Sequence, residues 1–259
     1  MISKTLIVVS DKFSNFTMGK QAVTESQLHA MLALPEQILP GRTCLVPGQG
    51  LSETKLAALI AMIEAEDPHG KRWDASLLRE LPDRAGSMLS HKHLPANTLI
   101  SRPERMGEAS YRLDMRIDQN CELMGDHQTG QHVQGMILVE AARQSFLAVS
   151  EAFYPHPVSE KTYFVIQALT TDFVGFIFPL AAHIDYRVLA FDENERRQKF
   201  KVEMDFVQGG EIRTSVSFSF TVYPHDVISE KEASLADVAI QAAMSNVTAT
   251  TVLPLGRVA

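Results

Sequence analysis

Two histidines and two carboxylates gather in a short stretch of the chain, between residues 126 and 140. An imidazole titrates near neutral pH, so His127 and His132 are candidate general bases. Asp126 and Glu140 could orient an imidazole or take up a proton, which makes them candidate catalytic residues as well. Each histidine also has a structural interpretation, since His127 could bond a loop carbonyl and His132 could cap a helix. Asp126 could equally form a turn, and Glu140 could face solvent.

The next residues predict the start of a helix at Gly135. The free N–H groups of a first helical turn, together with the helix dipole, could stabilise a developing oxyanion. Because Gly135 has no side chain, a substrate carbonyl could approach the backbone closely. Arg143 lies three residues after Glu140, where it could pair with that carboxylate or bind a phosphate.

The predicted helix, residues 135–153, is apolar around most of its circumference, and a helix of this kind must be largely buried. One stripe is large and apolar, and the other consists mostly of small residues that allow a sheet to approach closely. The first stripe contains Val139, Ala142, Phe146, Val149 and Phe153, and the second contains Leu138, Ala141, Ser145, Ala148 and Ala152.

Strands are predicted on both sides of this helix, because most of these segments alternate apolar and polar residues with a period of two. They cover residues 111–117, 162–169, 184–188, 200–206 and 212–222. Gly209 and Gly210 predict a hairpin turn. A terminal helix is expected at 230–244, with a loose tail after Asn246. One strand, one long helix and four strands predict an α+β hotdog fold, in which a curved antiparallel sheet wraps a central helix.

Residues 1–85 predict a small N-terminal α/β region of unknown role. Strands are expected at 5–9 and 43–46, and helices at 24–34 and 53–66, with Thr24 and Ser52 as N-caps. Gly48 and Gly50 precede the second helix and could cradle an anion. The full dinucleotide fingerprint is absent, so a tight turn into a capped helix is the favoured interpretation.

Residues 67–95 are irregular and polar, which predicts a linker. His91 and His93 lie within this stretch and just before the hotdog strands. No third ligand stands near them at a telling spacing, so a surface loop is favoured over a metal site. We expect neither a metal nor a cofactor.

The composition restricts the class of protein. The chain has 259 residues and a net charge of −7, which argues against nucleic-acid binding through clustered Lys and Arg. Cys44 and Cys121 share no metal-ligand spacing, which indicates a reducing compartment. The N-terminal apolar run is too short for a signal peptide, and no run is long enough to cross a bilayer. We therefore expect a cytoplasmic protein without a nucleic-acid or membrane partner.

The run from His132 to Gln144, preceded by Asp126 and His127, resembles the signature of the AfsA-type (A-factor biosynthesis) hotdog family. That signature has a His, then a His-Val-x-Gly-Met turn and a Glu-Ala-Ala-Arg-Gln helix start. Residues 91–101 are similar to the family's domain entry, and the resemblance covers about 90–224. More distantly, the layout resembles β-hydroxyacyl-ACP dehydratases and the related thioesterases. In the dehydratases a loop His and a helix Glu face each other across a subunit interface.

The resemblance implies an enzyme that acts on acyl thioesters. AfsA-type proteins are associated with moving a β-ketoacyl group from an acyl carrier protein to the hydroxyl of dihydroxyacetone phosphate, toward γ-butyrolactone signals. The carrier here could also be CoA. The signature makes Gly135, Met136, Arg143 and Gln144 candidate substrate-binding residues. The alternatives are a dehydratase or thioesterase of the same fold and a non-catalytic acyl-thioester binding protein.

Family members commonly hold two hotdog repeats, whereas this chain shows one motif. Residues 1–85 are then either a different domain or a degenerate repeat. With one hotdog, at 90–224, and a C-terminal helix and tail at 225–259, we expect a homodimer, because the active clefts of this fold lie between two hotdogs.

Overall fold

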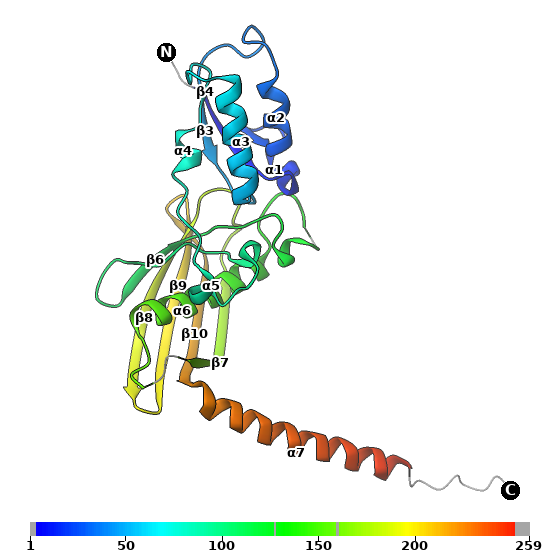
Figure 1. Cartoon of the computed structure of the whole chain (residues 1–259), viewed down its shortest axis with the longest axis vertical. Coiled ribbons are helices and arrows are strands. Elements are labelled where there is room, and N and C mark those ends of the chain that lie inside the picture. Colours follow the sequence, from blue (N-terminus) through cyan, green and yellow to red (C-terminus); the bar gives the residue numbers. More distant parts are fainter. Residues whose placement is uncertain (1–3, 127, 159–160, 252–259) are drawn as a thin grey trace, which may run out of the picture.

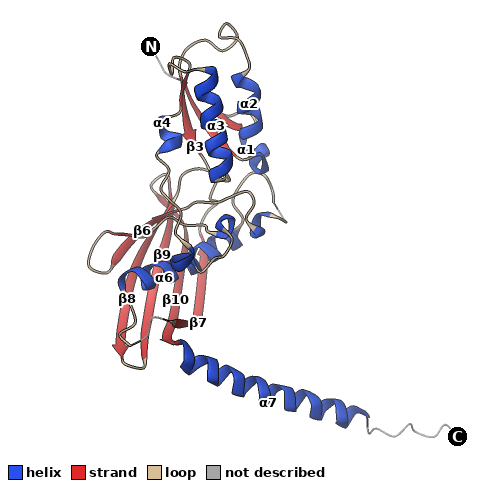
Figure 2. Cartoon of the chain, in the orientation of Figure 1, coloured by secondary structure: helices blue, strands red, loops and turns tan. Residues whose placement is uncertain are grey.

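The structure, a computed structural model, describes residues 4–126, 128–158 and 161–251, with only the backbone of 247–251. In this part of the chain a small α/β layer sits at one end of a larger curved sheet, and a long helix leaves the opposite end (Figure 1). The α+β class is thus confirmed, with helices and strands in both layers (Figure 2).

The N-terminal layer is a parallel sheet that, among the described residues, has four strands in the order β2-β1-β3-β4. Helices follow these strands and pack on the sheet, with a buried core that includes Leu28, Leu45 and Leu59. The strands are β1 (Lys4–Val9), β2 (Ala22–Thr24), β3 (Thr43–Pro47) and β4 (Trp73–Asp74). The helices are α1 (Ser14–Thr17), α2 (Glu25–Leu32), α3 (Glu53–Glu66) and α4 (Ser76–Arg79).

Both predicted N-caps are confirmed in this layer. The Thr24 hydroxyl accepts a hydrogen bond from the Gln27 N–H, and the Gln27 side chain accepts one from the Thr24 N–H, which forms a capping box. The Ser52 side chain accepts from the Lys55 N–H at the start of α3. These bonds satisfy donors that the first helical turn leaves unpaired.

The linker predicted at 67–95 is wrong, because β4 and two short helices lie within it. The Asp67 carboxylate accepts hydrogen bonds from the N–H groups of Lys71, Arg72 and Trp73, which folds the chain back so that β4 pairs with β3. After α4, helix α5 (Ser87–Ser90) packs on the central helix of the next layer.

The second layer confirms the hotdog fold. Its antiparallel sheet, in the described part of the chain, has the order β5-β6-β8-β9-β10-β7, and α6 (Gly135–Phe153) lies across its concave face (Figures 1 and 2). The strands are β5 (Glu104–Arg105), β6 (Ser110–Asp114), β7 (Thr162–Phe173), β8 (His183–Asn194), β9 (Arg197–Gln208) and β10 (Glu211–Pro224). Short 3-10 turns precede α1 (Asp11–Phe13), β5 (Pro95–Asn97) and α6 (Glu122–Met124).

Helix α6 is the core element that its two stripes predict. Phe146 is buried, with its ring stacked on Phe220 of β10 at a centroid separation of 4.3 Å. On the small-residue stripe, Ala141, Ser145 and Ala148 are fully buried. The small side chains therefore let the helix approach its neighbours closely, and the rings fill the remaining space.

The two layers are joined by the turn between β3 and α3, at Gly48, Gln49 and Gly50. The Gln49 side chain donates hydrogen bonds to the carbonyls of Met115 (3.0 Å) and Leu180 (3.3 Å) and accepts one from the Ile117 N–H (2.9 Å). Gly50 has a φ of +90°, a backbone conformation that favours glycine. The predicted tight turn is present. Its Gln49 side chain anchors the N-terminal layer to the hotdog layer through these hydrogen bonds.

Helix α7 (His225–Thr251) extends beyond the predicted 230–244 at both ends. The loose tail predicted after Asn246 is wrong as far as Thr251, where helical backbone continues. Helix α7 points away from the sheet (Figure 1). Of the helices that the structure describes, none has the length and apolar character needed to cross a membrane.

Candidate active site

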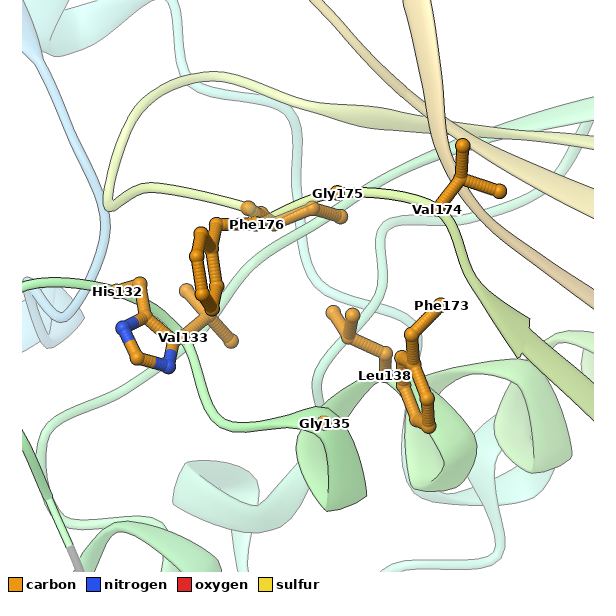
Figure 3. A pocket seen from close by; sticks show the side chains of 9 residues that line it. His132, Val133, Gly135, Leu138, Phe173, Val174, Gly175 and Phe176 are labelled. Atoms are coloured by element: carbon orange, nitrogen blue, oxygen red, sulfur yellow. The ribbon is translucent and has the colours of Figure 1, made fainter.

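A cavity of about 410 Å³ opens at the N-terminal end of α6 (Figure 3). One wall comes from the end of the polar loop and the first turns of α6, and the other from the segment that follows β7. A hydrogen bond from the Val133 N–H to the Ile177 carbonyl, 2.8 Å long, ties the two walls together. The lining is mostly apolar and consists of His132, Val133, Gly135, Leu138, Phe173, Val174, Gly175, Phe176 and Ile177.

His132 is the titratable residue of this lining. Its ring lies beside the Phe176 ring, with centroids 4.6 Å apart, and is half-buried (Figure 3). Its Nδ1 lies 3.3 Å from the Thr129 hydroxyl oxygen. That contact engages one ring nitrogen, so Nε2 is the atom suited to exchange a proton with a bound molecule.

The start of α6 has no side-chain cap. Gln134 occupies the N-cap position with extended backbone, and its amide group donates to the Leu123 carbonyl instead of capping the helix. An uncapped N-terminus with a positive dipole end is suited to hold an anion or a polarised carbonyl.

The Phe173 ring lies where a substrate carbonyl was expected to approach Gly135. A Cβ atom built on Gly135 would lie 2.9 Å from the Phe173 ring, so this ring occupies the approach that the sequence assigned to a carbonyl. Phe173 is 57% exposed, at the last position of β7. A side chain this exposed can change rotamer at low cost, which would open the helix N-terminus.

Glu140 lies away from the cavity and is held by three side chains. Its carboxylate accepts hydrogen bonds from Arg143 (2.8 and 2.9 Å) and Gln144 (3.0 Å) and pairs with Lys92 at 2.8 Å. Burial raises the pKa of Glu140, but the bonds from Arg143, Lys92 and Gln144 outweigh it and lower that pKa to about 2. A carboxylate so acidic is a weak base near neutral pH, so the geometry disfavours the predicted proton-accepting role.

Gln144 and Arg143, predicted to bind substrate, are engaged within the protein. Gln144 is fully buried, accepts a hydrogen bond from the Leu99 N–H and donates one to the Asn97 carbonyl, both at 2.8 Å. Arg143 pairs with Glu140, as its spacing allowed. Both residues therefore help to hold residues 92–99 against α6. Neither of them lines the cavity.

The remaining predicted residues are Met136, Asp126 and His127, and none of them lines this cavity in the described part of the chain. Met136 is exposed and lines a second cavity of about 310 Å³ that shares His132, Gly135 and Phe173 with the first. Asp126 is exposed on the preceding loop. His127 lies outside the described residues.

His91 of the domain entry contacts side chains of the hotdog layer. His91 Nε2 lies 3.0 Å from a carboxylate oxygen of Glu151, and its ring meets the edge of Phe164. Within the described ranges, no group of His, Cys, Asp and Glu side chains could hold a metal ion.

The second wall of the cavity was missed by sequence reasoning, which ended the strand before Phe173. Its signal is present in the run from Phe173 to Phe178, which is apolar throughout apart from Gly175. A connection between two strands is normally polar, so an apolar one indicates a binding surface or a packed segment.

Comparison with known proteins gives a family. Residues 73–224, more than half of the chain, match the A-factor biosynthesis (AfsA) hotdog domain. A search of curated proteins found no match.

Among solved structures, a conserved protein from Pseudomonas aeruginosa is 16% identical, with 46% of this chain and 86% of that chain covered and a TM-score of 0.34. A thioesterase candidate from Shewanella oneidensis is 11% identical, with 48% and 83% covered and a TM-score of 0.37. A mutant thioesterase from Pseudomonas aeruginosa is 14% identical, with 48% and 81% covered and a TM-score of 0.33.

Proposed function

Because the chain belongs to the A-factor biosynthesis (AfsA) hotdog family, we propose that it is an enzyme acting on acyl thioesters, carried by an acyl carrier protein or CoA. The observation that carries the proposal is the apolar cavity with His132 at its rim and the uncapped start of α6 in its wall. The acyl chain would lie along Leu138 and Ile177. Its thioester carbonyl would face the N–H groups beside Gly135 once the Phe173 ring has turned.

The chemistry follows from these groups. His132 Nε2 would take the proton of an attacking hydroxyl as the new C–O bond forms at the thioester carbon. The helix N-terminus would stabilise the tetrahedral oxyanion. When the C–S bond breaks, the thiol leaves with the proton that His132 returns, so the imidazole is neutral again at the end.

A β-ketoacyl transfer to a hydroxylated acceptor such as dihydroxyacetone phosphate is the first candidate reaction, since the family is associated with A-factor biosynthesis. The nine residues that line the cavity in the described part of the chain include no Lys or Arg. A phosphate-bearing acceptor would need a cation from outside this lining. Hydrolysis of the thioester by water needs no such cation, so a thioesterase is the second candidate.

One assay separates the candidates by product. The purified protein would be incubated with β-ketoacyl-CoA and β-ketoacyl-ACP, with and without dihydroxyacetone phosphate, and separately with a β-hydroxyacyl thioester, and the products identified by mass spectrometry. An acyl ester formed only with the acceptor indicates transfer, a free acid indicates hydrolysis, and an enoyl product from a β-hydroxyacyl thioester indicates dehydration. Binding without turnover of any thioester would contradict an enzymatic role.

His132→Gln is expected to lower kcat by about 10²- to 10⁴-fold, the usual contribution of a general base. Substrate affinity should change little, because Gln retains much of the side-chain volume. His69→Gln, in an exposed loop of the N-terminal layer, is the matched control and should leave kcat unchanged. His127→Gln belongs in the same series, since the sequence proposes His127 as an alternative base. Loss of activity in that variant alone would move the base from His132 to His127.

We propose further that two copies pair through β7. This strand is twelve residues long and stands at one end of the sheet order, so one of its edges has no neighbouring strand among the described residues. Ile166 and Leu169 on it are 44% and 45% exposed. A long, apolar, unpaired edge is a site for pairing with another chain. Two-fold pairing would extend the sheet continuously from one copy into the other.

A further inference from the structure

Helix α7 is an arm that contacts β7 and β10 where it begins. It begins where β10 ends, beside the first residues of β7, with a 2.9 Å hydrogen bond from the His225 N–H to the Lys161 carbonyl. The Tyr163 hydroxyl donates to the Glu232 carboxylate two turns later. Twenty-seven residues make an α-helix about 40 Å long, and the rest of it projects past the β7 side of the sheet (Figure 1).

The projecting part is apolar around most of its circumference between residues 235 and 244. Leu235, Val238, Ile240 and Met244 are each more than half exposed. Alanines fill the positions between them, and the polar residues Ser234, Asp237 and Gln241 form one narrow strip. A helix with this pattern is stable in water only when its apolar side is covered.

We infer that a second copy of this chain covers it, and that the arm lies on the rim of that copy's cavity. This inference rests on the dimer proposed above. Two identical strands that offer the same edge can pair only about a two-fold axis, which makes them antiparallel. The Thr162 end of β7 is then next to the Phe173 end of its mate. Helix α7 starts at the first of these ends, and the cavity opens at the second.

The rim offers the arm a matching surface. Val174, Phe176 and Met136 are 70%, 64% and 60% exposed around the cavity. The arm runs past the β7 edge (Figure 1), which is the direction in which the paired copy would lie. Its alanines permit close approach to the rim. Each cavity would then be closed by an apolar wall from the other protomer, which suits a long acyl chain.

Cysteine cross-linking in the full-length protein tests this contact. One preparation carries Ala239→Cys and the other Val174→Cys, both with Cys44→Ser, since Cys121 is buried. After the two are mixed and allowed to exchange subunits, a short bis-maleimide should give a covalent dimer in the mixture and little in either preparation alone. A cross-link of Ala239→Cys with itself would instead show that two arms pair with each other, and would overturn the inference.

A second measurement, the rate of thiol labelling at position 174, reports whether the arm covers the rim of the cavity. Ala239→Glu puts a carboxylate in the middle of the apolar side, and Gln241→Glu puts one on the polar strip as the matched control. In the Val174→Cys background, Ala239→Glu should raise the rate of thiol labelling about tenfold, and Gln241→Glu should not. Sedimentation distinguishes failure of the arm contact from failure of the dimer. A stable dimer with unchanged labelling refutes the arm contact, whereas a monomer in the unmodified chain refutes the proposed dimer itself.

Discussion

At the scale of single residues, the Glu140 carboxylate joins the domain entry to the central helix. Lys92 reaches it from the entry segment, and Arg143 and Gln144 reach it from the next turn of α6. Gln144 then bonds the backbone of Asn97 and Leu99. The conformation of residues 92–99 thus depends on two side chains of α6.

Glu140→Gln should therefore act on stability. The pKa of Glu140 is lowered from 4.5 to about 2, which corresponds to about 3 kcal/mol of folding free energy at neutral pH. Since the folded pKa is the lower one, this contribution is complete above pH 5 and is lost as the pH falls toward 2. The wild type and the variant should differ by about 3 kcal/mol at pH 7 and converge toward pH 2 in urea unfolding.

The control for that series is Glu36→Gln, whose side chain is exposed in the loop after α2. It should match the wild type at every pH. If Glu140→Gln folded with unchanged stability but lost all activity, the carboxylate would have a role in the reaction after all.

The His132–Gln144 signature identifies important positions but does not give the role of each residue. Glu140 and Gln144 could be singled out from the sequence as polar residues on a buried helix, and both do need partners. Their partners Lys92, Asn97 and Leu99 lie more than forty residues earlier, and no periodicity relates such distant positions. His132, by contrast, stands at the helix start, where local spacing was enough to place it.

At the scale of elements, the shape of the cavity depends on how α6 begins and how β7 ends. Gly135 and Phe173 meet there, and the Phe173 ring occupies the space where a side chain on Gly135 would lie. In the proposed mechanism, this ring is a cover that the thioester must displace to reach the helix N-terminus.

Gly135→Ala tests this arrangement. The added methyl group would lie 2.9 Å from the Phe173 ring and would force it outward at small cost, because that ring is exposed. The melting temperature should change by only a few degrees. Turnover should fall at least about tenfold, because the methyl group occupies the place of the thioester oxygen. Gly86→Ala, where a new methyl group meets no atom within 4 Å, is the control. Full activity in Gly135→Ala would show that the N-terminal end of α6 does not stabilise the oxyanion.

Elements with a strong internal period could be predicted from the sequence. Helix α6 and strands β8, β9 and β10 carry such patterns over many residues, and each is present. Strand β4 has only two residues, which is too short for an alternating pattern to predict it. Its pairing depends instead on the Asp67 turn and on β3. Strand β7 continues to Phe173 because β10 pairs with it along its whole length.

At the scale of the whole molecule, the free edge of β7 predicts a dimer that a single charge should break. Leu169 lies near the middle of β7, so Leu169→Lys would bring two lysines close together across a two-fold axis. Sedimentation should show a monomer or a much weaker dimer. Leu189→Lys, at a leucine on β8 that is 55% exposed against 45% for Leu169, should leave the dimer intact. Equal mass for all three proteins would place the dimer contact elsewhere or show that the chain is monomeric.

The two layers of one chain should also unfold together, because the side chain of Gln49 from the first layer is bonded inside the second. Gln49→Ala would leave the carbonyls of Met115 and Leu180 and the N–H of Ile117 without this partner, at a cost of about 2–3 kcal/mol. Trp73, the one tryptophan of the chain, is buried in the N-terminal layer, so its fluorescence reports on that layer alone. In the wild type, the fluorescence and circular dichroism transitions in urea should coincide.

In Gln49→Ala the fluorescence transition should move to lower urea concentration than the circular dichroism transition, because the small parallel sheet loses its support from the hotdog. Gln21→Ala, with an exposed side chain in the same layer, should keep the two transitions together. Separate transitions already in the wild type would show that the layers are independent. In that case the N-terminal layer could be removed without loss of the cavity, and activity of residues 80–259 alone, which lack β4 and α4, would become the direct measure of what it contributes.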